Sequence, residues 1–366
     1  MKSRQTSIAC SLIRGGTSRG AYFLGKDLPS DVDLRDRVLT AVMGGPDPLQ
    51  IDGIGGGHSL TSKVAIVGPA SVDNADVDYL FLQVAPDNSF VSTTQNCGNL
   101  LAGVGPFVID NGLIQAGDDK TKIRVHMLNS GSLCELTVST PDGIVEHEGT
   151  TAIDGVPGTS SAIVCDFPDL AGSTTGALLP TGNVVDKVAG LRVTCIDNGM
   201  PVVLVRAADL GVSGYEEPES LEANVALRET IENLRIQAGP MMNLGDVTKK
   251  SVPKICLVAA PANGGNVSTR TFIPRDCHRA VGVLGAVTVA TACLLPGSIA
   301  EGIATIPDGV EKTFSVEHPS GVMQIRLVVD ENAEPQKSII RVGVLRTART
   351  LMRGEVLIPP QTWNGR

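Results

Sequence analysis

The sequence has few aromatic residues. Of 366 residues one is Trp, three are Tyr and seven are Phe, although 42% are hydrophobic. A buried core must therefore consist mainly of Val, Ile, Leu and Ala, and the 41 glycines indicate many tight turns. At this length the chain is long enough for two domains, each with its own core.

Positive charge is also scarce. The 30 basic residues are outnumbered by 39 acidic ones, which gives a formal net charge of −9. This balance argues against a nucleic-acid-binding surface. It fits a soluble cytoplasmic protein.

The eight cysteines show no regular spacing. They stand at positions 10, 97, 134, 165, 195, 256, 277 and 293, without a C-x-x-C pair. Neither a disulfide framework nor a zinc site is indicated, and such scattered cysteines are typical of reduced thiols in the cytoplasm. We expect no metal.

Long hydrophobic runs are absent too. The longest, Ala280–Leu295, has 16 residues and ends at Pro296-Gly297, so it is short for a membrane span and typical of a buried helix. The first residues, Met1–Thr6, lack the apolar segment of a signal peptide. We expect no contact with a membrane.

The segment 94–107 contains the strongest candidate for a reactive group. Cys97 is followed by Gly98, Asn99 and a run of small apolar residues, which predicts a thiol at the first turn of a buried helix. The unpaired N–H groups and the positive end of the helix dipole stabilise a thiolate or a bound carboxylate there. The alternative is an inert buried cysteine, since free cysteines are usually buried.

A short strand, Ile8–Ile13, is predicted to lead into a turn at Arg14–Gly20. The glycines of this turn allow a close approach of the backbone to a ligand, and its hydroxyl and guanidinium groups are suitable donors for carboxylates. The alternative is a plain hairpin loop with solvated arginines.

A second glycine-rich segment, Asp52–Lys63, precedes a predicted strand at Val64–Val67. It does not fit the phosphate-binding P-loop, because Ser62 stands where that loop needs glycine and a strand follows instead of a helix. Lys63 would lie at the start of a strand beside a glycine loop, where desolvation favours a lysine that acts as a base. The alternative is a surface cation.

The remaining pattern is one of strands separated by turn residues, with few helices. Helices are predicted at Asp33–Met43 and Glu217–Gln237, and a glycine and hydroxyl loop is predicted through Arg270. Strands are predicted at Val77–Val84, Ile123–Met127, Cys134–Val138, Ala162–Phe167, Leu191–Ile196, Val202–Val205 and Lys254–Ala259.

The second half of the chain repeats the plan of the first. Asp276-Cys277-His278-Arg279 precedes an apolar helix of small residues, as Cys97 does. Two such halves indicate duplicated domains whose helix N-termini meet at a shared cleft, a frequent place for ligands. The crossing is expected at Pro180–Asn183, which gives domains of residues 1–183 and 184–366, with the last strand able to return to the first domain.

Six motifs carry a resemblance to a known family. They are Arg14-Gly-Gly-Thr-Ser-Arg-Gly, Gln50-Ile-Asp-Gly-Ile-Gly-Gly, Thr61-Ser-Lys-Val, Asn96-Cys-Gly-Asn, Pro180-Thr-Gly-Asn and His318-Pro-Ser-Gly. In this order and over nearly the whole chain they resemble the methylaconitate isomerase and 4-oxalomesaconate tautomerase family. The resemblance implies the α+β fold of diaminopimelate epimerase, in which two similar domains each wrap a β-sheet or barrel around a central buried helix.

The resemblance also implies an activity. Thr194-Cys-Ile-Asp-Asn-Gly-Met and Phe272-Ile-Pro-Arg-Asp-Cys-His are most similar to the oxalomesaconate tautomerase branch, which serves the breakdown of gallate, protocatechuate and lignin-derived aromatics. The expected reaction moves a proton between carbons of 4-oxalomesaconate, a tricarboxylic keto acid. Lys63 and Cys97 would be the acid–base pair, without a metal or organic cofactor, and a homodimer is compatible with the resemblance.

The substrate-binding residues are expected on the basis of charge, donor type and motif position. They are Arg14, Thr17, Ser18, Ser62, Gly98, Asn99, Cys277 and His278. Cys277 is included because the related epimerase uses a second cysteine at its second helix. The sequence does not decide which of Lys63 and Cys97 is the base.

Three other functions stay open at this point. The nearest is cis–trans isomerisation of 2-methylaconitate with the same pair. A cysteine hydrolase would require a hydrogen bond between Cys97 and His278. A non-catalytic carboxylate-binding protein would use the same loops without chemistry.

Overall fold

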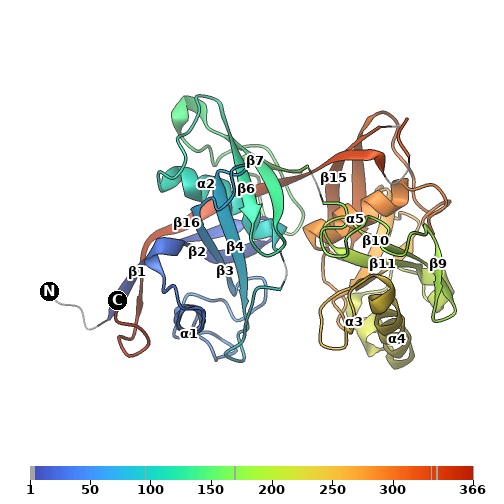
Figure 1. Ribbon diagram of the computed structural model, residues 1–366, viewed down its shortest axis with the longest axis horizontal. Coiled ribbons are helices and arrows are strands. Elements are labelled where there is room, and N and C mark those ends of the chain that lie inside the picture. The colour runs from blue at the N-terminus through green and yellow to red at the C-terminus, as the bar shows by residue number, and fades with distance from the viewer. Residues whose placement is uncertain (1–4, 95, 169, 331, 335–336, 366) are drawn as a thin grey trace. The chain divides into compact units, whose positions relative to one another are not determined.

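The computed structural model describes residues 5–94, 96–168, 170–330, 332–334 and 337–365. Gln95, which belongs to the motif around Cys97, lies outside these residues. The chain divides into two compact units. Figure 1 labels the helices and strands of each. Unit 1 comprises Met1–Cys165 together with Arg346–Arg366, and unit 2 comprises Asp166–Leu345.

Unit 1 is a closed ring of β-strands around one helix (Figure 1). Helix α2 (Gly98–Asp110) lies inside, and its residues from Leu100 to Val108 are buried. The last strand pairs with the first, which closes the ring, and the short β5 (Val91–Ser92) pairs with β4. In order around the ring the strands are β1 (Thr6–Gly15), β2 (Ser18–Leu24), β3 (Lys63–Pro69), β4 (Val77–Val84), β6 (Lys120–Met127), β7 (Ser132–Ser139), β8 (Ala162–Phe167) and β16 (Ile339–Ile358).

Strands β2 to β4 of unit 1 have two covered faces. Alternate residues of β2 to β4 point toward α2, and the others pack with helix α1 (Val32–Met43) in a second core. Because both faces are covered, these strands read as apolar runs. Helix α1 begins where the Asp31 side chain accepts a hydrogen bond from Leu34 N and ends at Gly44, which has a φ of 87°.

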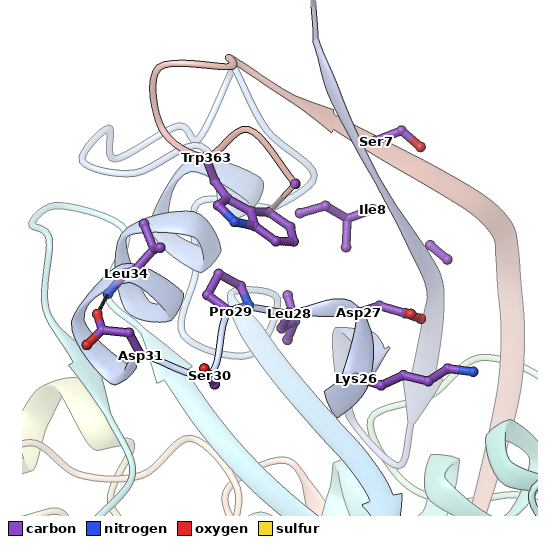
Figure 2. A pocket seen from close by; sticks show the side chains of 12 residues that line it. Ser7, Ile8, Lys26, Asp27, Leu28, Pro29, Ser30, Asp31, Leu34 and Trp363 are labelled. Atoms are coloured by element: carbon purple, nitrogen blue, oxygen red, sulfur yellow. Dashed lines mark hydrogen bonds between the residues drawn. The ribbon is translucent and has the colours of Figure 1, made fainter.

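The tryptophan packs on the α1 side of unit 1. Figure 2 shows the Trp363 ring facing Ile8, Leu28 and Pro29. These residues line a cavity of about 720 Å³. Thr6 Oγ1 donates to the carbonyl of Trp363, which ties the end of the chain to β1. The residues that line this cavity include none of the predicted catalytic or substrate-binding residues.

Unit 2 repeats the strand plan of unit 1. Antiparallel and parallel pairings alternate from β1 to β6 in unit 1 and from β10 to β14 in unit 2. Helix α5 (Val283–Leu294) is buried almost throughout. The strands are β9 (Asp186–Val188), β10 (Leu191–Asp197), β11 (Pro201–Arg206), β12 (Lys254–Ala259), β13 (Val267–Phe272), β14 (Glu311–His318) and β15 (Gly321–Val329), which pairs with the first part of β16.

Three local expectations for unit 2 are wrong. The helix predicted at Glu217–Gln237 is two helices, α3 (Pro218–Ala223) and α4 (Val225–Met241), because Asn224 leaves the helical conformation and caps α4 with its side chain. The predicted loop through Arg270 contains strand β13. Cys277 does not begin a helix, since α5 starts only at Val283.

The segment 166–183, predicted as part of the first domain, belongs to unit 2. Its backbone is bound to β10. Thr174 N and Thr175 N each donate to Asp197 Oδ2 at 2.9 Å, and Gly172 N donates to the Asp197 carbonyl. Among the described residues, no helix is both long and apolar enough to cross a membrane.

Candidate active site

Cys97 immediately precedes helix α2, as the sequence predicts. It is the N-cap residue, with φ −128° and ψ 95°, and its thiol is half-buried. Because the Cys97 side chain makes no capping hydrogen bond, the N–H groups of Gly98, Asn99 and Leu100 at the first turn are available to an anion. Both expected partners of Cys97 in the motif, Gly98 and Asn99, therefore lie at a site with positive potential.

Glycines allow the β1–β2 hairpin to approach this helix start closely. A Cβ on Gly15 would lie 2.4 Å from the carbonyl oxygen of Asn99, and one on Gly16, whose φ is +50°, would lie 2.2 Å from Asn99 Oδ1. A Cβ on Gly20 would meet both Leu100 Cδ2 and Lys63 O at 2.7 Å. The glycines of the first motif thus place β2, α2 and the start of β3 in contact.

Lys63 is the first residue of β3. It pairs with Gly20 of β2 on one side and with Gln83 of β4 on the other. The residue is only 8% exposed, so it is not the surface cation of the alternative interpretation. The Nζ atom donates to Gln83 Oε1 at 2.8 Å and lies 4.9 Å from the centre of the Phe81 ring.

Strand β4 positions both members of the predicted pair. Tyr79, Phe81 and Gln83 alternate along it and therefore share one face. Phe81 and Gln83 contact Lys63, while Tyr79 Oη donates to the carbonyl of Cys97 at 3.2 Å. Burial raises the pKa of Tyr79 well above its ordinary value, and Cys97 adds to this shift, so the phenol stays protonated and remains a donor.

Three expected substrate ligands lie at the same end of α2. Asn99 Nδ2 donates to Thr17 Oγ1 at 3.0 Å. The hydroxyl of Ser18 is buried and has no hydrogen-bond partner among the described residues, and the same holds for Asn99 Oδ1. Ser18 lies on the face of β2 that also carries Gly20, which packs against Leu100. These groups retain hydrogen-bonding capacity for a ligand.

Arg14 lies on the other face of the sheet. It pairs directly with Arg19, a neighbour in β2 of Ser18 and Gly20, so both arginines point away from α2. The Arg14 guanidinium donates to the carbonyl and hydroxyl oxygens of Thr347, both at 2.9 Å. Burial lowers the pKa of Arg14, and Arg349 adds to this. The structure does not bring Arg14 to the face that carries Lys63.

Ser62 is occupied within the fold. Its side chain is 0% exposed, accepts from Gln50 Nε2 at 2.6 Å and donates to the Val84 carbonyl at 2.8 Å. It therefore fixes the glycine-rich segment to β4 directly before Lys63. The predicted contact with substrate stays untested, but the hydroxyl has no donor left for it.

Cys277 and His278 belong to unit 2. Cys277 is buried in the core with α4, and its N–H donates to Glu222 Oε1 at 3.0 Å. Burial raises the pKa of its thiol to about 11, partly offset by Arg270. His278 Nδ1 accepts from Ala280 N at 2.9 Å. Neither residue shares a unit with Lys63 and Cys97.

Sequence reasoning missed the contacts that strand β4 provides. The signal was present, because Tyr79, Phe81 and Gln83 stand at alternate positions of a strand that was predicted with its correct ends. What the sequence lacks is the register of β3 against β4, which pairs Lys63 with Gln83.

Comparison with known proteins places this chain in a family. The family described as PrpF protein matches residues 5–359. The chain belongs to that family. It is 55% identical to 4-oxalomesaconate tautomerase of Pseudomonas putida, with 99% of each chain covered. It is 54% identical to (4E)-oxalomesaconate Delta-isomerase of a Novosphingobium species, with 96% of this chain and 98% of the relative covered.

Solved structures agree with the fold. A crystal structure of methylitaconate-delta-isomerase matches 98% of this chain and 97% of its own, with a TM-score of 0.86 and 33% identity. A hydroxyproline epimerase from Agrobacterium vitis matches 96% of this chain and 93% of its own, with a TM-score of 0.55 and 14% identity. The latter shows the fold alone. The predicted α+β, epimerase-like fold is confirmed.

Proposed function

We propose that this PrpF-family protein is a cofactor-independent isomerase that moves a proton between carbons of 4-oxalomesaconate. The observation that carries the proposal is the match of 55% and 54%, over nearly the whole chain, to two enzymes named for oxalomesaconate. The 2-methyl-aconitate isomerase of Shewanella oneidensis, which represents the alternative activity, is only 34% identical. The substrate is accordingly a small tricarboxylate, and the reaction serves the breakdown of aromatic compounds in the cytoplasm.

Lys63 and Cys97 are the proposed acid–base pair. Transfer of a proton along a conjugated keto acid requires one group that removes it at the first carbon and one that delivers a proton at the second. Strand β4 contacts both residues, through Gln83 and Phe81 at the amine and through Tyr79 at the carbonyl of Cys97. The Lys63 amine and the backbone of Cys97 are thereby both held by strand β4.

The start of helix α2 is the proposed site for the negative charge of the intermediate. Removal of a proton next to the keto group leaves a dienolate, which preoriented N–H donors stabilise. Gly98 and Asn99 present such N–H groups at the uncapped end of the helix. Ser18 and Thr17 add hydroxyl groups beside it, and these are suited to a substrate carboxylate.

A spectrophotometric substrate panel tests the function. We expect purified protein to change the ultraviolet spectrum of 4-oxalomesaconate at micromolar enzyme concentration, and to act far more slowly on 2-methylaconitate. EDTA should leave the rate unchanged. Faster turnover of 2-methylaconitate would favour the alternative isomerase, an acyl-enzyme burst with ester substrates would favour the cysteine hydrolase, and tight binding without turnover would leave a carboxylate-binding protein.

Deuterium oxide tests the two-group mechanism. If separate groups take and give the proton, each exchanging with solvent, the product should carry one deuterium at the newly protonated carbon during the first turnover. Proton NMR or mass spectrometry measures this. Retention of the original hydrogen at early conversion would instead indicate transfer by a single base.

A further inference from the structure

Lys63 has neighbours that fix the direction of its amine. Within the residues that the structure describes, no carboxylate lies within ion-pair distance of it. Its polar contact is the side-chain amide of Gln83, at 2.8 Å, and its other close partner is the Phe81 ring. A buried lysine held by a neutral acceptor and an aromatic face can change its protonation state without breaking an ion pair.

The amide of Gln83 is itself held in one orientation. Its Nε2 donates to the carbonyl of Ser62 at 2.8 Å and to the carbonyl of Ser59 at 3.1 Å. Two carbonyl acceptors on one side require the NH₂ group there, so the amide oxygen must face Lys63. A flipped amide would place an oxygen against two oxygens and an NH₂ group against the amine.

The Ser62 residue that orients Gln83 is fixed in turn, and its carbonyl also accepts from Val84 N at 3.2 Å. Gln50, which is 1% exposed, donates from Nε2 to Ser62 Oγ and accepts from Gly57 N at 3.0 Å. Ser62 Oγ donates to the carbonyl of Val84, the residue after Gln83. The glycine-rich segment that does not fit a phosphate loop therefore has a specific role here, because it carries the acceptors for Gln83.

We propose that Gln83 is the positioning residue of Lys63. By holding the amine through its oxygen, Gln83 directs the remaining protons or the lone pair of Nζ away from β4. The proposal rests on the proposed function insofar as Lys63 takes part in proton transfer, but the contact itself can be tested without substrate.

Two substitutions at Gln83 should move the titration of Lys63 in opposite directions. Gln83→Glu places a carboxylate at the amine and should shift the titration to higher pH, whereas Gln83→Met removes the acceptor and should shift it to lower pH. Both variants lose the donors to Ser59 and Ser62, and Gln83→Glu also places an oxygen against these two carbonyls, so circular dichroism must first show that each variant is folded. The difference between them reports the contact with Lys63.

Competitive labelling with acetic anhydride over a range of pH, read at the Lys63 peptide by mass spectrometry, measures this titration directly. The control is Gln324→Glu, the same substitution at an exposed position of strand β15. It should leave the Lys63 titration unchanged. If both Gln83 variants titrate Lys63 as the wild type does, Gln83 does not control the amine and the proposal is wrong.

The pH–rate profile connects the contact with catalysis. In Gln83→Glu the limb that depends on Lys63 should move to higher pH, and the limb that moves identifies the role of Lys63: the acidic limb if it is the base, the alkaline limb if it is the acid. Gln83→Met should lower kcat roughly 10- to 100-fold, as expected for a lost hydrogen bond to a charged group, with a smaller effect on KM.

Failure of this inference can be distinguished from failure of the proposed function. If Lys63→Ala retains full activity, the assignment of Lys63 as a catalytic residue fails, whatever Gln83 does. If Lys63→Ala is inactive and the Gln83 variants change neither the labelling titration nor the pH–rate profile, only the role of Gln83 is refuted.

Discussion

Tyr79 donates a hydrogen bond to the main-chain carbonyl of Cys97 from the same strand face that holds the side chain of Lys63. The contact is to the backbone, so it fixes where helix α2 begins and leaves the thiol unengaged. Burial keeps the Tyr79 phenol protonated. The start of the helix and the lysine are therefore positioned by one strand.

Removal of either member of the pair should abolish most of the activity. We expect Lys63→Ala and Cys97→Ala each to lower kcat by about 10²- to 10⁴-fold, the usual contribution of a general acid or base. Circular dichroism should show an intact fold. Lys187→Ala, at an exposed position of β9, is the control. A folded variant that keeps more than roughly a tenth of the wild-type rate would remove that residue from the mechanism.

Cys97 should be the first thiol to react in the native protein. It is half-buried, whereas the other seven cysteines are buried. Burial also raises the pKa of Cys195 and of Cys256 to about 12, which leaves little thiolate at neutral pH. Iodoacetamide should label Cys97 alone, with activity lost in parallel, as peptide mass spectrometry can determine. Unfolded chain, labelled at all eight positions, is the control, and early labelling elsewhere would contradict the prediction.

Gly15 should not tolerate a side chain. In Gly15→Ala the added methyl would meet the Asn99 carbonyl oxygen at 2.4 Å and Leu100 Cα at 3.1 Å, so the first turn of α2 must move. We expect a loss of about 1–3 kcal/mol in the free energy of unfolding, typical of overpacking, and a lower kcat. Gly68→Ala in β3, where nothing lies within 4 Å of the new Cβ, should be nearly neutral. Equal denaturation midpoints for the two variants would be inconsistent with this packing.

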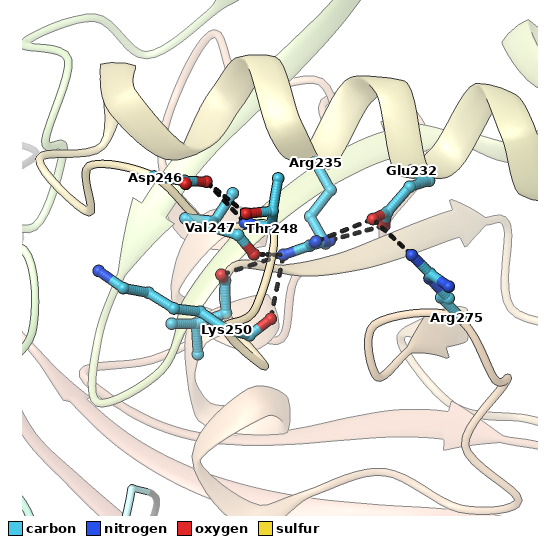
Figure 3. A network of polar contacts seen from close by, with 8 residues as sticks. Glu232, Arg235, Asp246, Val247, Thr248, Lys250 and Arg275 are labelled. Atoms are coloured by element: carbon cyan, nitrogen blue, oxygen red, sulfur yellow. Dashed lines mark hydrogen bonds and ion pairs between the residues drawn. The ribbon is translucent and has the colours of Figure 1, made fainter.

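Lys254 should make stability depend on pH above neutrality. Burial lowers its pKa from 10.5 to about 8, and the nearby Arg235 contributes. Figure 3 shows Arg235 held by Glu232 and by backbone carbonyls, including that of Val247. Because the pKa is lower in the folded state, the unfolded chain binds more protons between pH 8 and 10.5. The free energy of unfolding therefore rises with pH across this window, by up to about 1.4 kcal/mol per unit.

Urea denaturation at several pH values measures this dependence. Lys254→Met should remove the rise, since methionine fills the site without a charge. Lys187→Met, at an exposed lysine, should retain it. Parallel curves for the wild type and Lys254→Met would mean that the amine is not buried as described.

The sequence predicted regular elements best where turn residues bound a strand on both sides. The strands β4, β8 and β12 have the predicted ends. The prediction from sequence was wrong where a single residue leaves the helical backbone conformation and sets the start of a helix. Asn224 interrupts what periodicity alone suggests is one helix. Gly282 is the N-cap of α5, which starts at Val283, six residues after Cys277, although the apolar run begins earlier. Hydrophobic pattern does not locate such caps.

The residue types of the candidate site were predictable from the sequence, but the face of the sheet on which each side chain lies was not. The placement of Cys97 before a buried helix followed from the residues after it. Arg14 was predicted in a turn, but β1 continues to Gly15 and pairs Arg14 with Arg19, so its side chain points away from α2. Because β1 is longer than predicted, Arg14 follows the alternation of the strand, and its pairing with Arg19 sets the face on which its side chain lies. The sequence pattern does not contain this pairing.

Strand β16 has a consequence for how the protein folds during synthesis. Its first residues pair with β15 in unit 2, and its later residues pair with β1. Strand β1 is synthesised first, but it can pair with β16 only after all of unit 2 has been translated. Unit 2 is a continuous segment and can fold first. The ring of strands around α2 can close only after the later residues of β16 have been synthesised. Premature termination near residue 345 would leave β1 with an open edge, a feature that promotes aggregation.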